Sequence, residues 1–333
     1  MEVVGNVHAQ NLIRFGRRHA EVVVLSADLT SSTEAEPFKL EFPDRFYSMG
    51  MAEQNMMSVA GGLAREGLVP LVHDFAVFMY RRALDQIEMS IAYPALPVKM
   101  LGFLPGITTP GGVSHQAIND LAVMTALPNL TVLECSDATD VESVLDVAYA
   151  VEGPVYVRML RGALRRLFTE PMQLGRSRRL ASTGNDVLLL SSGVCTSEAI
   201  AAVDVLVKNG AKITHLQVGT LKPFDDPLVL EALLEARQGI VTVENHLVDG
   251  GLGTATAVLM AENGIGQRLI RLGLQGTYAH GASQAHLMKE YGIDARAIGE
   301  AVERMLGIRS NRGTLEIEVS QGHSELGGRD EAL

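Results

Sequence analysis

The sequence predicts an α/β protein of two doubly wound domains, each built on a mostly parallel sheet. Short runs rich in Val, Ile and Leu alternate with longer stretches of helical period, and continuously apolar strands separated by helices are typical of parallel sheets covered on both faces. The alternation stops once, in a polar and basic segment, and then resumes. A length of 333 residues also exceeds the usual size of one hydrophobic core, so two domains are expected.

The first domain is predicted over residues 1–165. Its strands are expected at residues 22–26, 70–72, 98–101, 130–133 and 155–157, with helices between them. After Arg161 the sequence reads GALRRLFTEPMQLGRSRRLASTGND, which is polar, basic and irregular. Segments of this kind connect domains, so we assign residues 166–185 to a linker.

The second domain is predicted over residues 186–306, where the same alternation resumes. Strands are expected at residues 186–191, 213–217, 240–244 and 269–272, and helices at residues 197–208 and 253–263. From residue 307 onward the sequence has no period long enough to bury a face. Chain ends of this composition are typically mobile, so residues 307–333 are expected to form a flexible tail.

Composition narrows the range of partners. The net charge of -11 and the pI near 5.3 argue against nucleic acid, because binding to phosphates requires a basic surface. No run approaches the roughly 20 apolar residues of a membrane span, and the first residues lack the charged-then-apolar pattern of a secretory signal. We therefore expect no nucleic-acid partner, no membrane partner and a cytoplasmic location.

Two groups of residues that could suggest chemistry are better explained by packing. Cys135 and Cys195 lie in or beside predicted strands without metal-ligand spacing, so they are expected to be buried, reduced thiols. Gly250, Gly251 and Gly253, in VENHLVDGGLGTA, predict a tight strand-to-helix turn. They do not complete a dinucleotide-binding fingerprint, because its later ribose-binding acid is absent.

Glu53 is the first candidate for chemistry. It lies in the segment Phe42–Gly67, FPDRFYSMGMAEQNMMSVAGGLAREG, where a loop ending at Gly50 leads into a helix rich in Ala, Met and Gly. A carboxylate in the first turn of a helix ordinarily complements the helix dipole. A carboxyl group enclosed by apolar Met and Phe side chains would also be desolvated, and desolvation tunes many catalytic acids and bases.

An aromatic pair and a histidine follow Glu53 along the chain. Phe75 and Phe78, in HDFAVFMY, are either ordinary core residues or a stacking surface for a flat heterocycle. His115 follows a Gly-rich loop and precedes a predicted helix. It is either a cap or surface residue, or an imidazole that faces a cleft and binds an oxygen or relays a proton.

Asp28, Ser32 and Arg161 are further candidates. Asp28, in LSADLTSST, follows the first predicted strand, at the sheet edge where open parallel sheets bind ligands. Asp28 and Ser32 could equally be caps of a turn. Arg161, in GPVYVRMLRG, carries the planar guanidinium that suits a phosphate, and Arg158 is a nearby competitor.

Taken together, these segments resemble the transketolase family over about residues 10 to 306. MGMAEQN is similar to the GIAEQN-type signature of that family's pyrimidine-binding domain, and DFAVF is similar to its TFxxF-like segment. The stretch GITTPGGVSHQAINDLAVMTALPNLTVLECSDATDVESVL resembles the pattern GIT...GASHQ...DIA...LPNMTV...PADAVE. VENHLVDGGLGTA is similar to the family's C-terminal domain. Several ordered segments make a chance resemblance improbable.

The resemblance implies that residues 1–165 form a thiamine diphosphate pyrimidine-binding domain and residues 186–306 a transketolase C-terminal domain. It implies that Glu53 is catalytic and contacts ring N1' of the cofactor's aminopyrimidine, where it favours the imino tautomer. It also implies the other roles: Phe75 and Phe78 pack on the aminopyrimidine, Asp28 lies near the thiazolium, His115 is catalytic and binds substrate, Arg161 binds the sugar phosphate, and Ser32 also meets substrate.

The resemblance further implies a partner chain. Members of the family hold the diphosphate through Mg2+ bound by a GDG...N motif on another domain, and this sequence contains no such motif. Mg2+ requires such oxygen ligands. We therefore expect a separate N-terminal, diphosphate-binding transketolase subunit, self-association into an α2β2 assembly, and transfer of a two-carbon ketol unit between sugar phosphates.

Two alternatives remain open at this point. One is the β subunit of a thiamine-dependent 2-oxo-acid dehydrogenase, which shares both domains. The other is a non-catalytic regulatory subunit of the same fold. The GIT...SHQ segment and LPNLTV favour the transketolase, and the presence of both Glu53 and His115 disfavours a non-catalytic subunit.

Three departures from the family pattern predict an unusual substrate. Leu104 stands where transketolases typically have a histidine, TPGG at Thr109–Gly112 replaces an acidic GEDG turn, and Gly5 aligns with an expected arginine. Each departure removes a polar contact to the ordinary phosphosugar. We expect an atypical ketose phosphate, such as a branched one, or a shorter acceptor, with Arg161 kept for the phosphate.

Overall fold

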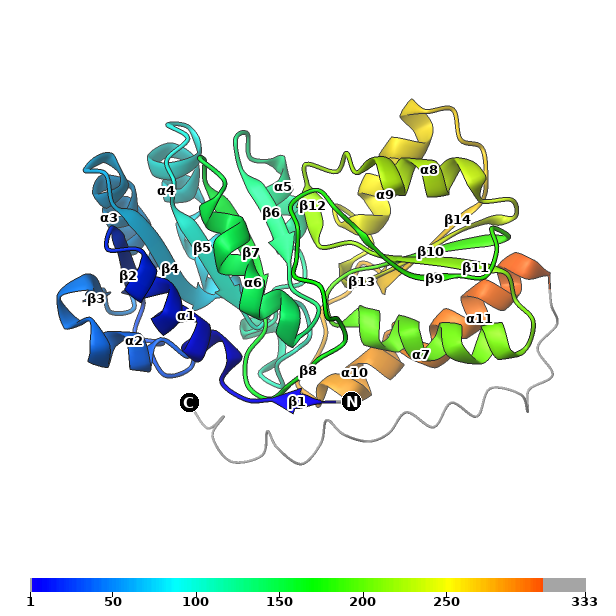
Figure 1. The fold of residues 1–333 in the computed structure, drawn as a ribbon, viewed down its shortest axis with the longest axis horizontal. Coiled ribbons are helices and arrows are strands. Elements are labelled where there is room, and N and C mark those ends of the chain that lie inside the picture. Colours follow the sequence, from blue (N-terminus) through cyan, green and yellow to red (C-terminus); the bar gives the residue numbers. More distant parts are fainter. Residues whose placement is uncertain (1, 308–333) are drawn as a thin grey trace.

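The computed structural model describes residues 2–307 and shows two α/β units side by side (Figure 1). The predicted fold class, with mostly parallel sheets covered by helices, is confirmed. None of the helices within residues 2–307 is long and apolar enough to span a bilayer. The expected tail, residues 307–333, lies outside the described residues except for Gly307, which follows the last helix in the left-handed conformation.

The first unit is a seven-stranded sheet in the order β12-β6-β7-β5-β4-β2-β3. Its own strands are all parallel: β2 (Val22–Ser26), β3 (Phe46–Ser48), β4 (Val69–Phe75), β5 (Lys99–Phe103), β6 (Thr131–Glu134) and β7 (Val155–Met159). Every residue of β2, VVVLS, is buried, as expected for a strand covered on both faces.

The helices of the first unit cover this sheet in two groups. In one group α1 packs on α6, and in the other α3 packs on α4. The regular helices are α1 (Val7–Arg18), α2 (Glu36–Glu41), α3 (Glu53–Arg65), α4 (Ala76–Gln86), α5 (Asp120–Ala126) and α6 (Ala138–Tyr149). Shorter helical turns are η1 (Pro43–Arg45), η2 (Ile87–Ala92) and η3 (Gly112–Ser114).

The second unit is a five-stranded sheet in the order β14-β13-β10-β11-β9. The strands are β9 (Arg178–Ser182), β10 (Val187–Ser191), β11 (Ile213–Gln217), β13 (Gly239–Leu247) and β14 (Leu269–Leu274). The helices are α7 (Cys195–Lys208), α8 (Pro227–Glu235), α9 (Leu252–Glu262), α10 (Gln284–Glu290) and α11 (Ala295–Leu306). Strand β9 runs antiparallel to β11 and falls inside the predicted linker, so residues 166–185 are not irregular throughout.

Two small strand pairings and one buried arginine tie segments together. Strand β12 (Thr220–Lys222), which follows β11 in the chain, joins the first sheet antiparallel to β6, and β1 (Val3–Val4) pairs with β8 (Leu164–Arg165). Arg158 is fully buried and donates to Asp120 at 2.9 Å, to Glu134, and to the carbonyl of Asn245 at 3.0 Å. Arg158 therefore links the first unit to the second through these hydrogen bonds.

The residues predicted to be structural have structural roles. Cys135 and Cys195 are both buried and free, and burial raises the pKa of each thiol. A side chain at Gly251 would place its Cβ 1.8 Å from Glu244 Oε2. Both oxygens of Glu244 accept hydrogen bonds from backbone N–H groups at the start of α9, at 2.7 and 2.8 Å, and burial raises its pKa to about 8. The glycines thus allow a tight strand-to-helix turn.

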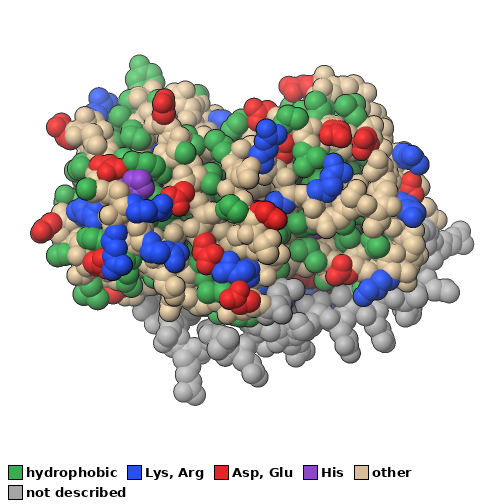
Figure 2. All heavy atoms as spheres, viewed as in Figure 1, with side chains coloured by type: hydrophobic (Ala, Val, Ile, Leu, Met, Phe, Trp, Pro, Cys, Tyr) green, Lys and Arg blue, Asp and Glu red, His purple; other side chains and the backbone are tan. Residues whose placement is uncertain are grey.

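Acidic and basic side chains are interspersed over the face shown in Figure 2. On helix α1, Arg17 pairs with Glu41 at 2.6 Å and Arg18 pairs with Asp146 at 2.9 Å, and all four side chains are at least partly exposed. Exposed pairs of this kind contribute little to stability.

Candidate active site

Glu53 is the first residue of α3, as predicted. The chain turns at Gly50, which has a left-handed φ of 68°, and becomes helical at Glu53. The Glu53 side chain is only 6% exposed, and its Oε1 accepts a hydrogen bond from Arg82 Nη1 at 2.5 Å. The carboxyl group is therefore largely removed from water and paired with one cation.

Arg82, on α4, links Glu53 to the aromatic pair and was not predicted from the sequence. Its guanidinium carbon lies 3.9 Å from the centre of the Phe78 ring, and 47% of its side chain is exposed. Arg82 follows Phe78 by four residues, so both project from the same side of the helix. That spacing is a signal in the sequence that could have identified Arg82.

Phe75 and Phe78 form a ring pair beside His115. Phe75 ends β4 and Phe78 lies in the first turn of α4, with ring centres 5.8 Å apart. The half-buried His115 ring lies edge-on to both, 5.3 Å from Phe78 and 6.3 Å from Phe75. A Cβ at Gly111 would come 2.9 Å from His115 Cβ, so glycine at this position lets the loop place the imidazole here.

Arg161 reaches the same ring pair from the loop after β7. Its guanidinium carbon lies 6.0 Å from the centre of the Phe75 ring. The competitor Arg158 cannot reach a substrate, because its side chain is fully buried among Asp120 and Glu134. The structure therefore brings Glu53, Phe75, Phe78, His115 and Arg161 into one cluster, joined through Arg82 and the aromatic rings.

Asp28 and Ser32 follow β2 at the carboxyl edge of the sheet, where β4 leads into Phe75. Ser26, the last residue of β2, pairs in register with His73 of β4, and Asp28 follows β2 by two residues. Asp28 is exposed and has a left-handed φ of 64°. Within residues 2–307 we find no side-chain hydrogen bond from Asp28 or Ser32 to the cluster.

Asp74 is a second carboxyl group near Glu53 that sequence reasoning missed. It is fully buried, and its Oδ1 accepts a hydrogen bond from the Phe75 N–H at 2.7 Å. Its Oδ2 has no hydrogen-bond partner among the described residues. Burial, and secondarily the nearby Glu53 charge, raise the pKa of Asp74 well above its ordinary value of 3.8. The signal in the sequence is a charged residue inside the apolar run VPLVHDF.

These residues fit the pyrimidine end of thiamine diphosphate. A flat nitrogen heterocycle needs ring surfaces to pack on and a carboxyl group for a ring nitrogen. Phe75 and Phe78 supply the surfaces, and Glu53 supplies the carboxyl group. The one group of potential metal ligands found within residues 2–307, His280, His286 and Glu290, is exposed and rich in imidazole, unlike the oxygen ligands that Mg2+ prefers.

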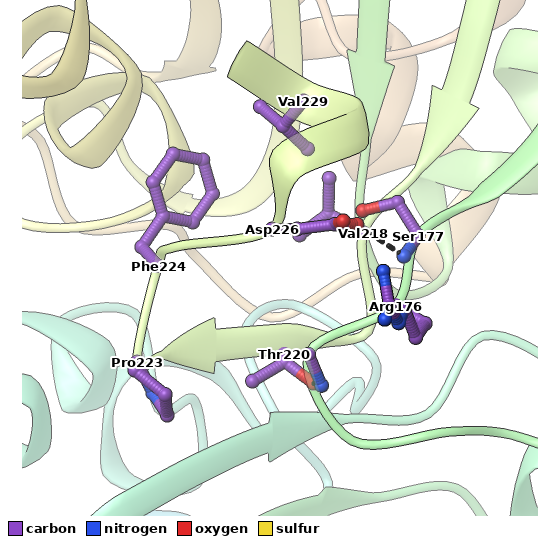
Figure 3. A pocket seen from close by; sticks show the side chains of 9 residues that line it. Arg176, Ser177, Val218, Thr220, Pro223, Phe224, Asp226 and Val229 are labelled. Atoms are coloured by element: carbon purple, nitrogen blue, oxygen red, sulfur yellow. Dashed lines mark hydrogen bonds between the residues drawn. The ribbon is translucent and has the colours of Figure 1, made fainter. Parts of the chain in front are cut away.

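A pocket beside β12 does not supply a second site. It lies between β12, the start of α8 and the segment before β9, and its lining residues are drawn in Figure 3. Its carboxylate, Asp226, already accepts from the Ser177 N–H at 2.5 Å and caps α8 through the Leu228 N–H at 3.0 Å. Asp226 is thus occupied by backbone contacts.

Comparison with known proteins gives the same assignment for both units. Residues 4–166 match the family model described as the transketolase pyrimidine-binding domain, and residues 175–298 match the transketolase C-terminal domain. A transketolase family protein of Sinorhizobium fredii is 41% identical over 86% of this chain and 84% of its own length. A 6-deoxy-6-sulfo-D-fructose transketolase subunit of Clostridium sp. is 34% identical over 88% of this chain and 91% of its own.

Longer relatives and a solved structure agree with this. The 1-deoxy-D-xylulose-5-phosphate synthase of Thermomicrobium roseum is 31% identical over 93% of this chain, which spans 49% of that protein. A structure named as a split gene transketolase, inactive beta4 tetramer, is 36% identical and superposes with a TM-score of 0.83 over 92% of this chain and 98% of its own. The chain therefore belongs to the transketolase family.

Proposed function

We propose that this chain is the pyrimidine-side subunit of a two-chain, thiamine-diphosphate-dependent transketolase. In this proposal the complex transfers a two-carbon ketol unit between sugar phosphates. The observation that carries the proposal is the clustering of a buried, helix-initiating Glu53 with Phe75, Phe78, His115 and Arg161. A non-catalytic subunit would have no need to bring a carboxyl group, an imidazole and a guanidinium to one aromatic pair.

Each residue of the cluster has a physical role in this proposal. Thiamine diphosphate, when bound, supplies an electron sink that no side chain can provide. Glu53 holds a proton at ring N1', while Phe75 and Phe78 fix the ring by packing. His115 donates to or accepts from a substrate oxygen at the edge of the ring pair. Arg161 binds the substrate phosphate through its planar guanidinium.

A partner chain completes the site in this proposal. The partner is a diphosphate-binding N-terminal transketolase subunit that holds Mg2+, and the assembly is α2β2. Two findings support it: the chain spans about half of a longer relative, and the split gene relative is named as an inactive beta4 tetramer. The direct test is ketol transfer from xylulose 5-phosphate by the chain reconstituted with such a partner. No transfer from any ketose would contradict the proposal.

A second candidate is synthesis of a 1-deoxyketose phosphate, which the likeness to 1-deoxy-D-xylulose-5-phosphate synthase favours. Forming a 1-deoxyketose requires a two-carbon donor unit without the hydroxyl group, and pyruvate provides such a unit when its carboxylate is lost as CO2. Incubating the reconstituted complex with pyruvate and an aldose phosphate separates the two reactions. The same assay with a lipoyl acceptor tests the 2-oxo-acid dehydrogenase alternative.

The substrate is predicted to be an atypical ketose. Leu104 is buried, with only 8% of its surface exposed, so it offers an apolar contact where the family pattern has an imidazole. A lost charge-assisted contact costs about 1.5 to 3 kcal/mol, or roughly ten- to a hundredfold in affinity. We expect a lower kcat/KM for xylulose 5-phosphate than for a branched ketose phosphate or a sulfonated ketose, measured across a panel with the reconstituted complex.

The R161M variant is the control for this panel. If Arg161 binds the anionic end, R161M should lower kcat/KM for every phosphorylated or sulfonated ketose and leave an unphosphorylated ketose unchanged. A matched variant of an exposed arginine on α11, R304M, should change neither. High efficiency with xylulose 5-phosphate and ribose 5-phosphate would show that the missing contacts are replaced elsewhere, and would end the substrate prediction.

A further inference from the structure

Asp74 is a buried carboxyl group that the proposed function does not use. It precedes Phe75 at the end of β4, and within residues 2–307 the one hydrogen bond found for its side chain is the one that Oδ1 accepts from the Phe75 N–H. Its Oδ2 is buried without a partner among residues 2–307. An ionised carboxylate in this position would lack the hydrogen bonds and the cation that a buried charge requires. Protonation of Asp74 avoids most of the free-energy cost of burying an unpaired charge.

The charged groups that face Asp74 belong to the two helices packed together over this end of β4. Glu53 of α3 acts on it as a like charge, and Arg82 of α4 acts as an opposite charge. The neighbouring strand β2, VVVLS, carries no titratable side chain. On β5, Lys99 donates to backbone carbonyls at the far end of the strand. The adjacent His73 is neutral, because burial lowers its pKa to about 4.

The carboxyl groups of Glu53 and Asp74 therefore lie near one guanidinium, that of Arg82, and only Glu53 binds it. Arg82 is committed to Glu53, at 2.5 Å, and makes no hydrogen bond to Asp74 in the described structure. Charge balance then requires one proton on the pair, and the deeper, unpaired Asp74 is the member that holds it. The raised pKa of Asp74 agrees with this assignment. Paired carboxyl groups of this kind titrate as a unit in which one proton is retained to higher pH.

We propose that Asp74 and Glu53 form a coupled carboxyl pair, and that Asp74 is a positioning residue that holds the single proton of the pair and so leaves Glu53 paired with Arg82. When Asp74 ionises at higher pH, its negative charge competes with Glu53 for the one guanidinium of Arg82. The coupling is a property of this chain alone. Its effect on cofactor activation rests on the proposed function.

The pH dependence of stability tests the pair without cofactor or partner. Because the folded-state pKa of Asp74 is raised above its unfolded value of 3.8, the folded chain keeps a proton that the unfolded chain has lost. The free energy of unfolding therefore falls as the pH rises above that value. The isosteric D74N variant has no carboxyl group at this position, so its free energy of unfolding should not fall with pH for this reason. The ratio of its unfolding constant to that of wild type should fall steadily between about pH 5 and about pH 8.

A double-mutant cycle with E53Q tests the coupling itself. In the E53Q background the like charge is gone, so the pH-dependent effect of the D74N substitution should shrink. We expect non-additivity of more than about twofold in the unfolding constant near pH 8 and near-additivity near pH 5. D85N, an exposed aspartate on the same helix as Arg82, is the matched control and should be additive with E53Q throughout. If D74N does not fold, D74S serves in the same cycle.

The third measurement is deuterium exchange at the cofactor C2 in the reconstituted complex, as a function of pH. In D74N the exchange rate should lose the dependence on pH that ionisation of Asp74 gives to the wild-type complex, because no second negative charge then competes with Glu53 for Arg82. An unchanged profile, or full additivity in the cycle, would overturn the proposal. If the double-mutant cycle shows coupling but the wild-type complex shows no exchange at C2, the carboxyl pair stands and the proposed function is wrong.

Discussion

Replacing Glu53 by Ala or Gln is expected to lower turnover by the reconstituted complex by at least about a hundredfold. A positioned acid or base typically contributes about 10² to 10⁴ in rate, and the cluster contains no second carboxyl group in contact with Arg82 that could take over. Gln keeps the shape of the side chain but cannot pass a proton to ring N1'. The measurement is the rate of deuterium exchange at C2 of bound thiamine diphosphate, because this rate isolates activation from sugar binding.

The Glu53 experiment has a matched control at the other end of the same helix. Glu66 follows α3, is exposed and makes no side-chain contact with the cluster, so E66A should exchange at the wild-type rate. Thermal unfolding of E53Q and E53A should show a folded chain, since Glu53 lies at a helix start rather than in the hydrophobic core. Wild-type exchange by folded E53Q would remove Glu53 from its proposed role.

Central strands and well-marked helix starts were predictable from the sequence. The strands at residues 22–26 and 213–217 were predicted at the bounds of β2 and β11, because VVVLS and ITHLQ are bounded by helical or polar stretches. The helix beginning near Glu53 was predictable because Gly50 ends the preceding loop and the Ala- and Met-rich run follows at once. These features depend on local pattern alone.

Edge strands were not predictable in the same way. Strand β9, RRLAS, is basic and only partly buried because it borders a single neighbour, so its sequence resembles a linker. Strand β12 has three residues and exists because it pairs with β6, far away in the chain. Pairing with a distant partner leaves no periodic signal in so short a segment.

The residues of the candidate site also divide into those that local sequence patterns indicate and those whose contacts depend on how distant segments pack. Glu53, Phe75, Phe78, His115 and Arg161 were predicted as candidates, and the structure brings them together. The sequence alone did not show that Arg82 pairs with Glu53, since adjacent arginines on a helix are usually solvated. Nor did it show that Asp74 is buried without a cation, because the partners of a strand residue depend on which helices cover the sheet.

The isolated chain is expected to have no transketolase activity and to bind thiamine diphosphate weakly. In the proposed function the cluster around Glu53 contacts only the aminopyrimidine part of the cofactor, and the sequence contains no GDG...N motif for a Mg2+–diphosphate group. Because the cation requires oxygen ligands that the partner would supply, residual binding to the isolated chain should not depend on Mg2+. Calorimetric titration with thiamine diphosphate, with and without Mg2+, measures both properties.

Thiamine without its diphosphate is the matched ligand for this experiment. If this chain contributes only the pyrimidine side, thiamine and thiamine diphosphate should bind the isolated chain equally weakly. In the complex with a diphosphate-binding partner, thiamine diphosphate should bind far more tightly than thiamine, and only when Mg2+ is present. Activity should rise with added partner and reach a plateau at one partner per chain. Tight, Mg2+-dependent binding to the isolated chain would show that the whole cofactor site lies within one polypeptide, and the two-chain model would then be wrong.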